Sequence, residues 1–148
     1  MSAHKPLEGV KVVELASFVA APTAGRMMAE MGADVIRVES TAGDPWRFYG
    51  ANCGLPITDE ENPLFDIYNL GKKDIQLNTK TPEGKEILFH LLDEADVFIT
   101  NNRLKSLVRS GLDYESLKDR FPKLIYGLVT GYGQTGPDVD APGYDGVA

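Results

Sequence analysis

Residues Val10-Lys11-Val12-Val13-Glu14-Leu15 give the clearest indication of the fold. A short run of apolar, β-branched residues like this one is typical of a buried strand in a parallel sheet. Similar runs recur, and we expect further strands at residues 34–39, 74–78, 96–100 and 124–130. Helical patterns separate these runs. The succession predicts an α/β fold, a Rossmann-like parallel sheet with flanking helices.

Helix start and stop signals lie between the predicted strands. Pro22 falls where a helix can begin, residues 23–31 form its body, and Gly32 is a typical stop. Thr81 can cap a second helix that has Pro82 at its first position. Shorter helices are expected at residues 63–70, 104–110 and 114–120, and residues 40–61 are expected to form a long connection.

Parallel sheets of this kind bind ligands at the carboxyl ends of their strands. The segments that follow the predicted strands are therefore the ones expected to carry function. They are residues 16–21, 40–47, 78–80, 101–103 and 131–136. We expect all five to converge on one edge of the domain.

Composition excludes several classes of protein. The 148 residues carry a net charge of −7, which argues against nucleic-acid binding. No apolar run is long enough to span a membrane, and the first residues lack the apolar core of a secretory signal. Cys53 is the single cysteine, as expected for a cytoplasmic protein, and His4 and His90 are too far apart to suggest a metal site.

Basic residues gather in the middle of this acidic chain. They are Lys72, Lys73, Lys80, Lys85, Arg103, Lys105 and Arg109. Such a zone suits a phosphorylated small molecule, although scattered solvated lysines would give the same pattern.

Common catalytic and nucleotide-binding patterns are missing. The turn after the first strand contains Gly25 but no Gly-x-Gly-x-x-Gly, and the chain has no Walker-type phosphate loop. Neither His90, within a predicted helix, nor Cys53, in a polar loop, has a clear catalytic partner. The pattern alone therefore indicates an α/β domain that binds a phosphorylated ligand.

A series of segments resembles the family III CoA-transferases, which include formyl-CoA and carnitine CoA-transferases. The series consists of residues 6–15, 20–22, 32–39, 43–47, 69–73 with 81–85, 95–101, 111–117 and 131–137. It covers almost the whole chain. Residues 14–22 and 59–63 are most similar to the enzymes that move CoA onto 2-hydroxy acids, such as phenyllactate and 2-hydroxyisocaproate CoA-transferases.

The resemblance implies an enzyme that exchanges CoA between an acyl-CoA and a carboxylic acid, with acyl-CoA as substrate and no tightly bound cofactor. In this family an aspartate forms a mixed anhydride and then a protein-bound thioester. That aspartate is expected after Ala148, so residues 1–148 are expected to be an incomplete CoA-binding N-terminal domain without a catalytic residue. The full-length protein is expected to be an interlocked, ring-shaped homodimer, and this part alone is expected to expose apolar surface.

The resemblance also implies which residues contact CoA. They are Val19, Ala20, Leu77, Asn78, Thr79, Lys80, Asn101, Asn102, Arg103, Arg109 and Tyr144. Lys80, Arg103 and Arg109 are expected to pair with phosphates, and backbone groups at Val19, Ala20 and Asn101 to hold the rest.

Some of these assignments have alternatives. Leu77 fits the core equally well. Some family members have an arginine at the position of Ser40, which is expected to contact a phosphate of CoA. Here that contact is expected either to be missing or to come from Arg37 or Arg47. A non-catalytic nucleotide-binding or interaction module is the alternative for the whole chain.

Overall fold

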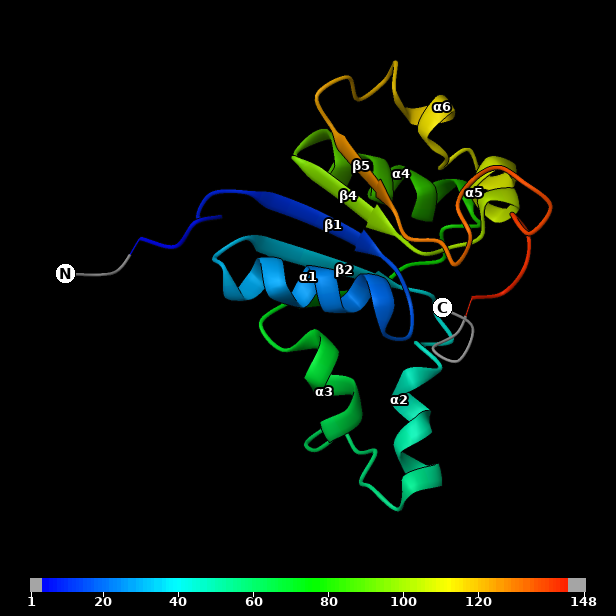
Figure 1. Ribbon diagram of the computed structural model, residues 1–148. Helices are drawn as coiled ribbons and strands as arrows, with labels where there is room; N and C mark the ends of the chain where they lie inside the picture. The colour runs from blue at the N-terminus through cyan, green and yellow to red at the C-terminus, as the bar shows by residue number, and fades with distance from the viewer. Residues whose placement is uncertain (1–3, 144–148) are drawn as a thin grey trace.

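A five-stranded parallel sheet forms the centre of the computed structural model, which describes residues 4–143 (Figure 1). Its strands are β1 (Lys11–Leu15), β2 (Asp34–Glu39), β3 (Lys73–Gln76), β4 (Val97–Thr100) and β5 (Ile125–Leu128). They lie in the order β3-β2-β1-β4-β5, and all neighbours are parallel. The chain winds outward from β1 in both directions, so the predicted α/β fold with a parallel sheet is confirmed.

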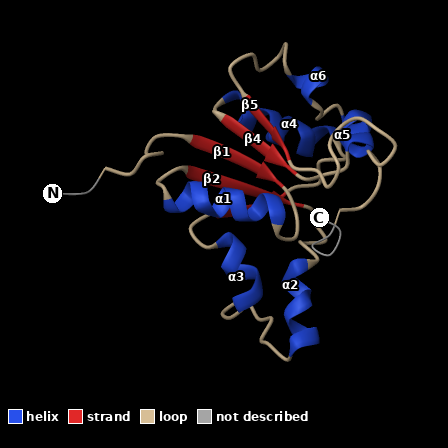
Figure 2. Ribbon diagram, in the orientation of Figure 1, coloured by secondary structure: helices blue, strands red, loops and turns tan. Residues whose placement is uncertain are grey.

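Helices cover both faces of the sheet (Figure 2). They are α1 (Ala20–Glu30), α2 (Trp46–Tyr49), α3 (Pro63–Asn69), α4 (Pro82–Asp93), α5 (Leu104–Ser110) and α6 (Tyr114–Leu117), with a 3-10 turn η1 at Gly50–Cys53. α1 and α3 lie on one side, and α4, α5 and α6 lie on the other (Figure 1).

Each face of the sheet has its own apolar core. On the α1 face, Val12 and Val35 pack with Ala21 of the helix. On the opposite face, Val13 and Phe98 lie in a larger cluster that draws leucines from three helices. Those leucines are Leu88, Leu92, Leu107 and Leu117. Because adjacent residues of a buried strand point to opposite faces, the apolar pair Val12-Val13 serves both cores.

The predicted boundaries differ from the observed ones mainly where a helix lacks a strong sequence signal. α1 begins at Ala20 rather than at Pro22, because a proline within the first turn needs no hydrogen-bond acceptor for its nitrogen. α2 and η1 fall in the predicted connection at residues 40–61 and are single turns without a side-chain cap. The predicted start of α4 is confirmed, since the Thr81 side chain accepts from the Gly84 amide at 3.2 Å.

A buried ion pair joins β1 to the chain before β3. The Lys72 ammonium lies 2.8 Å from Glu14 Oε2, and both side chains are almost fully buried. The same ammonium also donates to the carbonyl of Pro22 in α1. Burial raises the pKa of Glu14 and lowers that of Lys72, and the attraction between the two opposes both changes. Lys72 therefore belongs to the interior and not to the predicted basic zone.

Gly25 makes room for this pair beneath α1. A Cβ atom at position 25 would lie 1.8 Å from Glu14 Oε2 and 3.2 Å from Lys72 Nζ. A helix residue is normally improved by changing glycine to alanine, but here the added methyl group would collide with a buried carboxylate. The close approach of helix and strand thus depends on glycine at this position.

We expect Gly25→Ala to lower the free energy of unfolding by about 1–3 kcal/mol, because the methyl group must displace the Glu14 carboxylate. Urea denaturation of the wild type and the variant measures this change. The control is Met27→Ala in the same helix, where the side chain is 52% exposed and we expect a change within about 0.5 kcal/mol. A stabilised Gly25→Ala protein would contradict the packing described here.

Candidate functional site

A cleft of about 770 Å³ opens at the carboxyl ends of the strands. It lies beside the ends of β1 and β4, where the strand order reverses, and the arrowheads in Figure 1 point toward this edge. Its walls come from the segment after β1, from α2, from the segment after β4, and from the chain that follows β5. The residues that line it are Ser17–Ala20, Trp46, Tyr49, Asn101–Leu104, Val129–Gly133, Val139 and Ala141–Gly143.

The loop after β1 is held in an unusual conformation. Phe18 has a φ of 63°, in the left-handed region that non-glycine residues seldom adopt. Its amide donates to both carboxylate oxygens of Asp44, at 3.2 and 3.1 Å. The Asn101 side chain pairs with the Ser17 backbone in both directions, accepting from its amide at 3.0 Å and donating to its carbonyl at 2.7 Å. Two side chains from distant segments thus fix the first wall of the cleft.

A buried arginine lies behind this wall. The Arg37 guanidinium is fully buried, and it pairs with Glu39 at 2.7 Å and with Asp44. Its Nε atom lies 3.4 Å from Glu14 Oε1. Asp74 Oδ2 lies 3.5 Å from the same guanidinium, so four carboxylates surround one buried cation. Arg37 is not available to a ligand phosphate, which corrects one of the two expectations for the arginine that Ser40 replaces.

Arg47 also faces carboxylates. Its Nη2 atom lies 2.7 Å from Glu39 Oε1 and 3.0 Å from Asp74 Oδ2, and its guanidinium stacks 3.7 Å above the Phe65 ring. Burial raises the pKa of Asp74 to about 7, and the neighbouring Glu39 adds to the increase. Burial acts in the same direction on Glu39, but hydrogen bonds with Arg47 and Asp74 and the charges of Arg37 and Arg47 together outweigh it, so the pKa of Glu39 is lowered. Arg47 is committed to these partners and, like Arg37, does not line the cleft.

The structure brings together part of the predicted site. Val19, Ala20, Asn101, Asn102 and Arg103 line the cleft. Leu77, Asn78, Thr79, Lys80 and Arg109 do not, and Tyr144 lies outside the described residues.

The predicted residues outside the cleft have identifiable positions. Leu77 packs partly buried against the larger core, as the alternative reading allowed. Asn78–Lys80 form the tight turn before α4, after an edge strand two positions from the point where the order reverses. Arg109 is exposed in the last turn of α5. Four of the five predicted segments therefore meet at the cleft, and residues 78–80 do not line it.

Segment 40–47 was predicted to reach this edge, but the aromatic wall that Trp46 forms with Tyr49 was not predicted. The rings of Trp46 and Tyr49 are stacked, with centroids 4.7 Å apart and planes 11° apart. Phe18 packs against Trp46 at 6.3 Å, and the Trp46 indole donates to the Leu64 carbonyl at 3.0 Å. The available signal was the aromatic-rich run Trp46-Arg47-Phe48-Tyr49 in the connection that follows the second strand. The surrounding residues 40–61 are mostly polar and were predicted to be a connection, so the aromatic run was not recognised as part of the site.

The lining of the cleft suits binding better than covalent chemistry. Arg103 is its only charged side chain among residues 4–143, and amide, hydroxyl, aromatic and aliphatic groups line the rest together with glycine backbone. α1 begins at this cleft with Val19 as its N-cap residue and without a side-chain cap. The first amides of a helix lack intrahelical acceptors and favour negative groups. An anionic ligand with apolar parts fits this combination.

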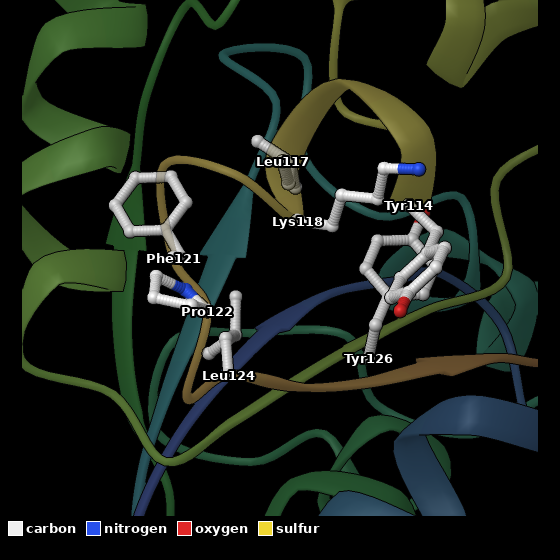
Figure 3. Close-up of a pocket in the computed structure, with 7 residues that line it drawn as sticks. All are labelled: Tyr114, Leu117, Lys118, Phe121, Pro122, Leu124 and Tyr126. Atoms are coloured by element: carbon white, nitrogen blue, oxygen red, sulfur yellow. The ribbon is translucent and has the colours of Figure 1, made fainter.

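A second pocket lies beside α6 and is much smaller, about 50 Å³ (Figure 3). Phe121, Pro122 and Leu124 form one side, and Tyr114 and Tyr126 lie opposite. The Tyr126 hydroxyl donates to the Leu112 carbonyl at 2.9 Å, and burial raises its pKa to about 12. The space is too small for a nucleotide, so it is a packing gap over the core.

Residues 4–143 contain no cluster of three or more side chains that could hold a metal ion. Within the same range, none of the helices is both long enough and apolar enough to cross a bilayer.

Fold and cleft together define an α/β protein with a cleft at the switch point of its parallel sheet, lined by groups that suit a small anionic molecule. Residues 7–148 match the family described as CoA-transferase family III, and the chain belongs to that family. The resemblance inferred from the sequence is thereby confirmed.

Known relatives of the chain are CoA-transferases. Cinnamoyl-CoA:phenyllactate CoA-transferase of Clostridium sporogenes is 54% identical over 137 residues, which are 93% of this chain and 33% of that protein. (R)-2-hydroxy-4-methylpentanoate CoA-transferase of Clostridioides difficile is 48% identical over 139 residues, covering 94% of this chain and 35% of that protein. The chain spans about a third of the length of these curated relatives.

A solved structure has the same fold. The crystal structure of a CAIB/BAIF family protein from Brucella suis superimposes with a TM-score of 0.89 and 44% identity. The match covers 97% of this chain and 38% of that one.

The carboxyl group of Asp74 gives stability a testable pH dependence. Because its folded pKa of about 7 exceeds the unfolded value, the folded state binds more protons between about pH 4 and pH 7. The free energy of unfolding should therefore fall as pH rises through this window. Asp74→Asn should make that fall smaller, as measured by urea denaturation at several pH values. Asp93→Asn, an exposed position on α4, controls for net charge, and an unchanged slope in Asp74→Asn would contradict the assignment.

Proposed function

We propose that this chain is the CoA-holding domain of an enzyme that transfers CoA from an acyl-CoA to a carboxylic acid. The observation that carries the proposal is the cleft beside β1 and β4, which combines Arg103, the start of α1 and an aromatic wall. Membership of CoA-transferase family III supports the same reaction. The alternative of a non-catalytic module has no observation in its favour.

Within the cleft, each group has a role suited to CoA. Arg103 pairs with a phosphate through its planar guanidinium. The amides at the start of α1, at Val19 and Ala20, face the ligand as donors. Both the oxygen and the nitrogen of the Asn101 side chain bond to Ser17, so we assign the contact of Asn101 with the ligand to its backbone. Asn102 completes the polar side.

The predicted contacts outside the cleft remain part of the proposal. CoA is an extended molecule, and its nucleotide end can reach past one cleft. The exposed turn Asn78–Lys80, Arg109 in α5 and, beyond the described residues, Tyr144 are the groups that we assign to that end. Leu77 contributes at most through the position of its backbone, because its side chain packs against the core.

The transfer step needs a nucleophilic carboxylate. We assign it to an aspartate after Ala148, as the family resemblance implies. Its oxygen attacks the thioester carbonyl, forming a mixed anhydride and releasing CoA thiolate. The thiolate then attacks the aspartyl carbonyl, which releases the donor acid and leaves an aspartyl thioester. The acceptor carboxylate reverses both steps, so CoA leaves on the acceptor and the aspartate is regenerated.

A 2-hydroxy acid with an aromatic or branched side chain is the acceptor we propose. The stacked Trp46 and Tyr49 give the cleft an apolar wall, and the names of two relatives include acids of this kind. A transfer assay on the full-length gene product with a panel of 2-hydroxy acids and dicarboxylic acids tests the class. Transfer to the 2-hydroxy acids is expected, and transfer to dicarboxylic acids alone would contradict it.

The full-length gene product is proposed to be a cytoplasmic homodimer. The single, exposed Cys53 of this chain is compatible with a reducing compartment. Light scattering on the full-length gene product measures the assembly directly, and a monomer would contradict the proposal.

Arg103 gives the sharpest test of CoA binding. We expect Arg103→Ala to weaken the Kd for CoA about tenfold, because a charge-assisted contact to phosphate is lost. Titration calorimetry with CoA measures it. Arg109→Ala should have a smaller effect, since α5 places Arg109 about 9 Å along the helix axis from Arg103.

Arg120→Ala is the matched control for these arginines. Arg120 lies over the Phe89 ring, away from the cleft, so its loss should leave the Kd for CoA unchanged. If Arg103→Ala bound CoA as tightly as Arg120→Ala does, the cleft would not be the CoA site.

A further inference from the structure

We infer that Asp44 is a positioning residue. It fixes two walls of the cleft at the relative position that CoA binding requires. The inference rests on the proposed function, because it concerns the same cleft. Asp44 is 2% exposed and does not line the cleft, so it acts only through the groups that it holds.

One carboxylate connects both walls. Asp44 accepts from the Phe18 amide in the loop after β1, and its Oδ1 atom also accepts from the Trp46 amide at 2.8 Å. Phe18 and Trp46 both line the cleft, and their rings pack against each other. The segment after β1 and the start of α2 therefore share a single acceptor.

The carboxylate itself is fixed from behind. Arg37 pairs with Asp44 and has a 3.4 Å contact to the Ala16 carbonyl at the end of β1. The Asp44 amide donates to Glu39 Oε2 at 3.1 Å, and this bond ties the residue to the end of β2. Asp44 thus has a defined position relative to both strands, and it transmits that position to the cleft.

The loop after β1 depends on this restraint. Phe18 holds a positive φ, which the surrounding structure must enforce. The amides at Val19 and Ala20, which we assign to CoA, follow directly. Without the Asp44 acceptor the loop loses the restraint that holds this conformation, and a shift of about 1 Å in groups that hold a substrate can cost about 100-fold in kcat/KM.

The first variant is Asp44→Asn, which keeps the shape and removes the charge. An asparagine presents an NH₂ group where the carboxylate faces only donors, from Phe18, Trp46 and Arg37. On the full-length gene product we expect the Kd for CoA to rise about tenfold or more, and KM for the acyl-CoA to rise more than kcat falls. Calorimetry with CoA and steady-state kinetics provide these values.

Two further variants separate positioning from stability. Asp44→Glu keeps the charge for Arg37 and displaces the acceptor by one methylene, so it should fold and still bind CoA more weakly. If Asp44→Asn does not fold, the Kd of Asp44→Glu for CoA tests the positioning role instead. Asp113→Asn is the matched control, because Asp113 is 7% exposed and caps α6 by accepting from the Ser116 amide, away from the cleft. It should lower the melting temperature without changing the Kd for CoA.

The outcomes distinguish this inference from the proposed function. If the wild type binds CoA and the folded Asp44 variants bind it within twofold of wild type, the positioning role is wrong and the proposed function stands. If Asp113→Asn weakens CoA binding as much as the Asp44 variants do, general destabilisation explains both and the role is again wrong. Failure of the wild type to bind CoA overturns the inference and the proposed function together.

Discussion

The structure depends on one buried cation, the guanidinium of Arg37, and on the carboxylates that neutralise it. A charge without solvent is tolerated only when it is paired and hydrogen-bonded. In the sheet, Glu14 of β1 and Asp74 of β3 are the register partners of Arg37 on either side. Asp44 reaches the same cation from the segment after β2. The pairing of Arg37 with these carboxylates therefore sets the strand register and the position of the segment after β2. The cleft lies beside this buried network.

Much of the fold could be predicted from local sequence. The β-branched runs around Val12-Val13 and Val35 mark buried strands, and Thr81-Pro82 marks a capped helix, because burial and capping leave direct traces in residue type. The ion network leaves no such trace. Arg37 and Lys72 look like ordinary charges along the chain, and only the strand order shows that carboxylates from other segments surround them.

The site was predictable to the extent that it follows from topology. Val19, Ala20 and the segment Asn101–Arg103 follow the two strands that flank the switch point, and they line the cleft. Asn78–Lys80 also follow a strand, but that strand is at the sheet edge, a position that sequence alone does not specify. The aromatic wall was missed because Trp46 and Tyr49 belong to a single helical turn without a cap, inside a polar connection.

We propose that CoA lies in the cleft between the start of α1 and Arg103. A crystal structure of the full-length gene product with CoA tests it most directly. We expect density for the ligand against the amides of Val19 and Ala20, with a phosphate oxygen within hydrogen-bonding distance of the Arg103 guanidinium. Ligand density at the opposite edge of the sheet, with this cleft empty, would contradict it.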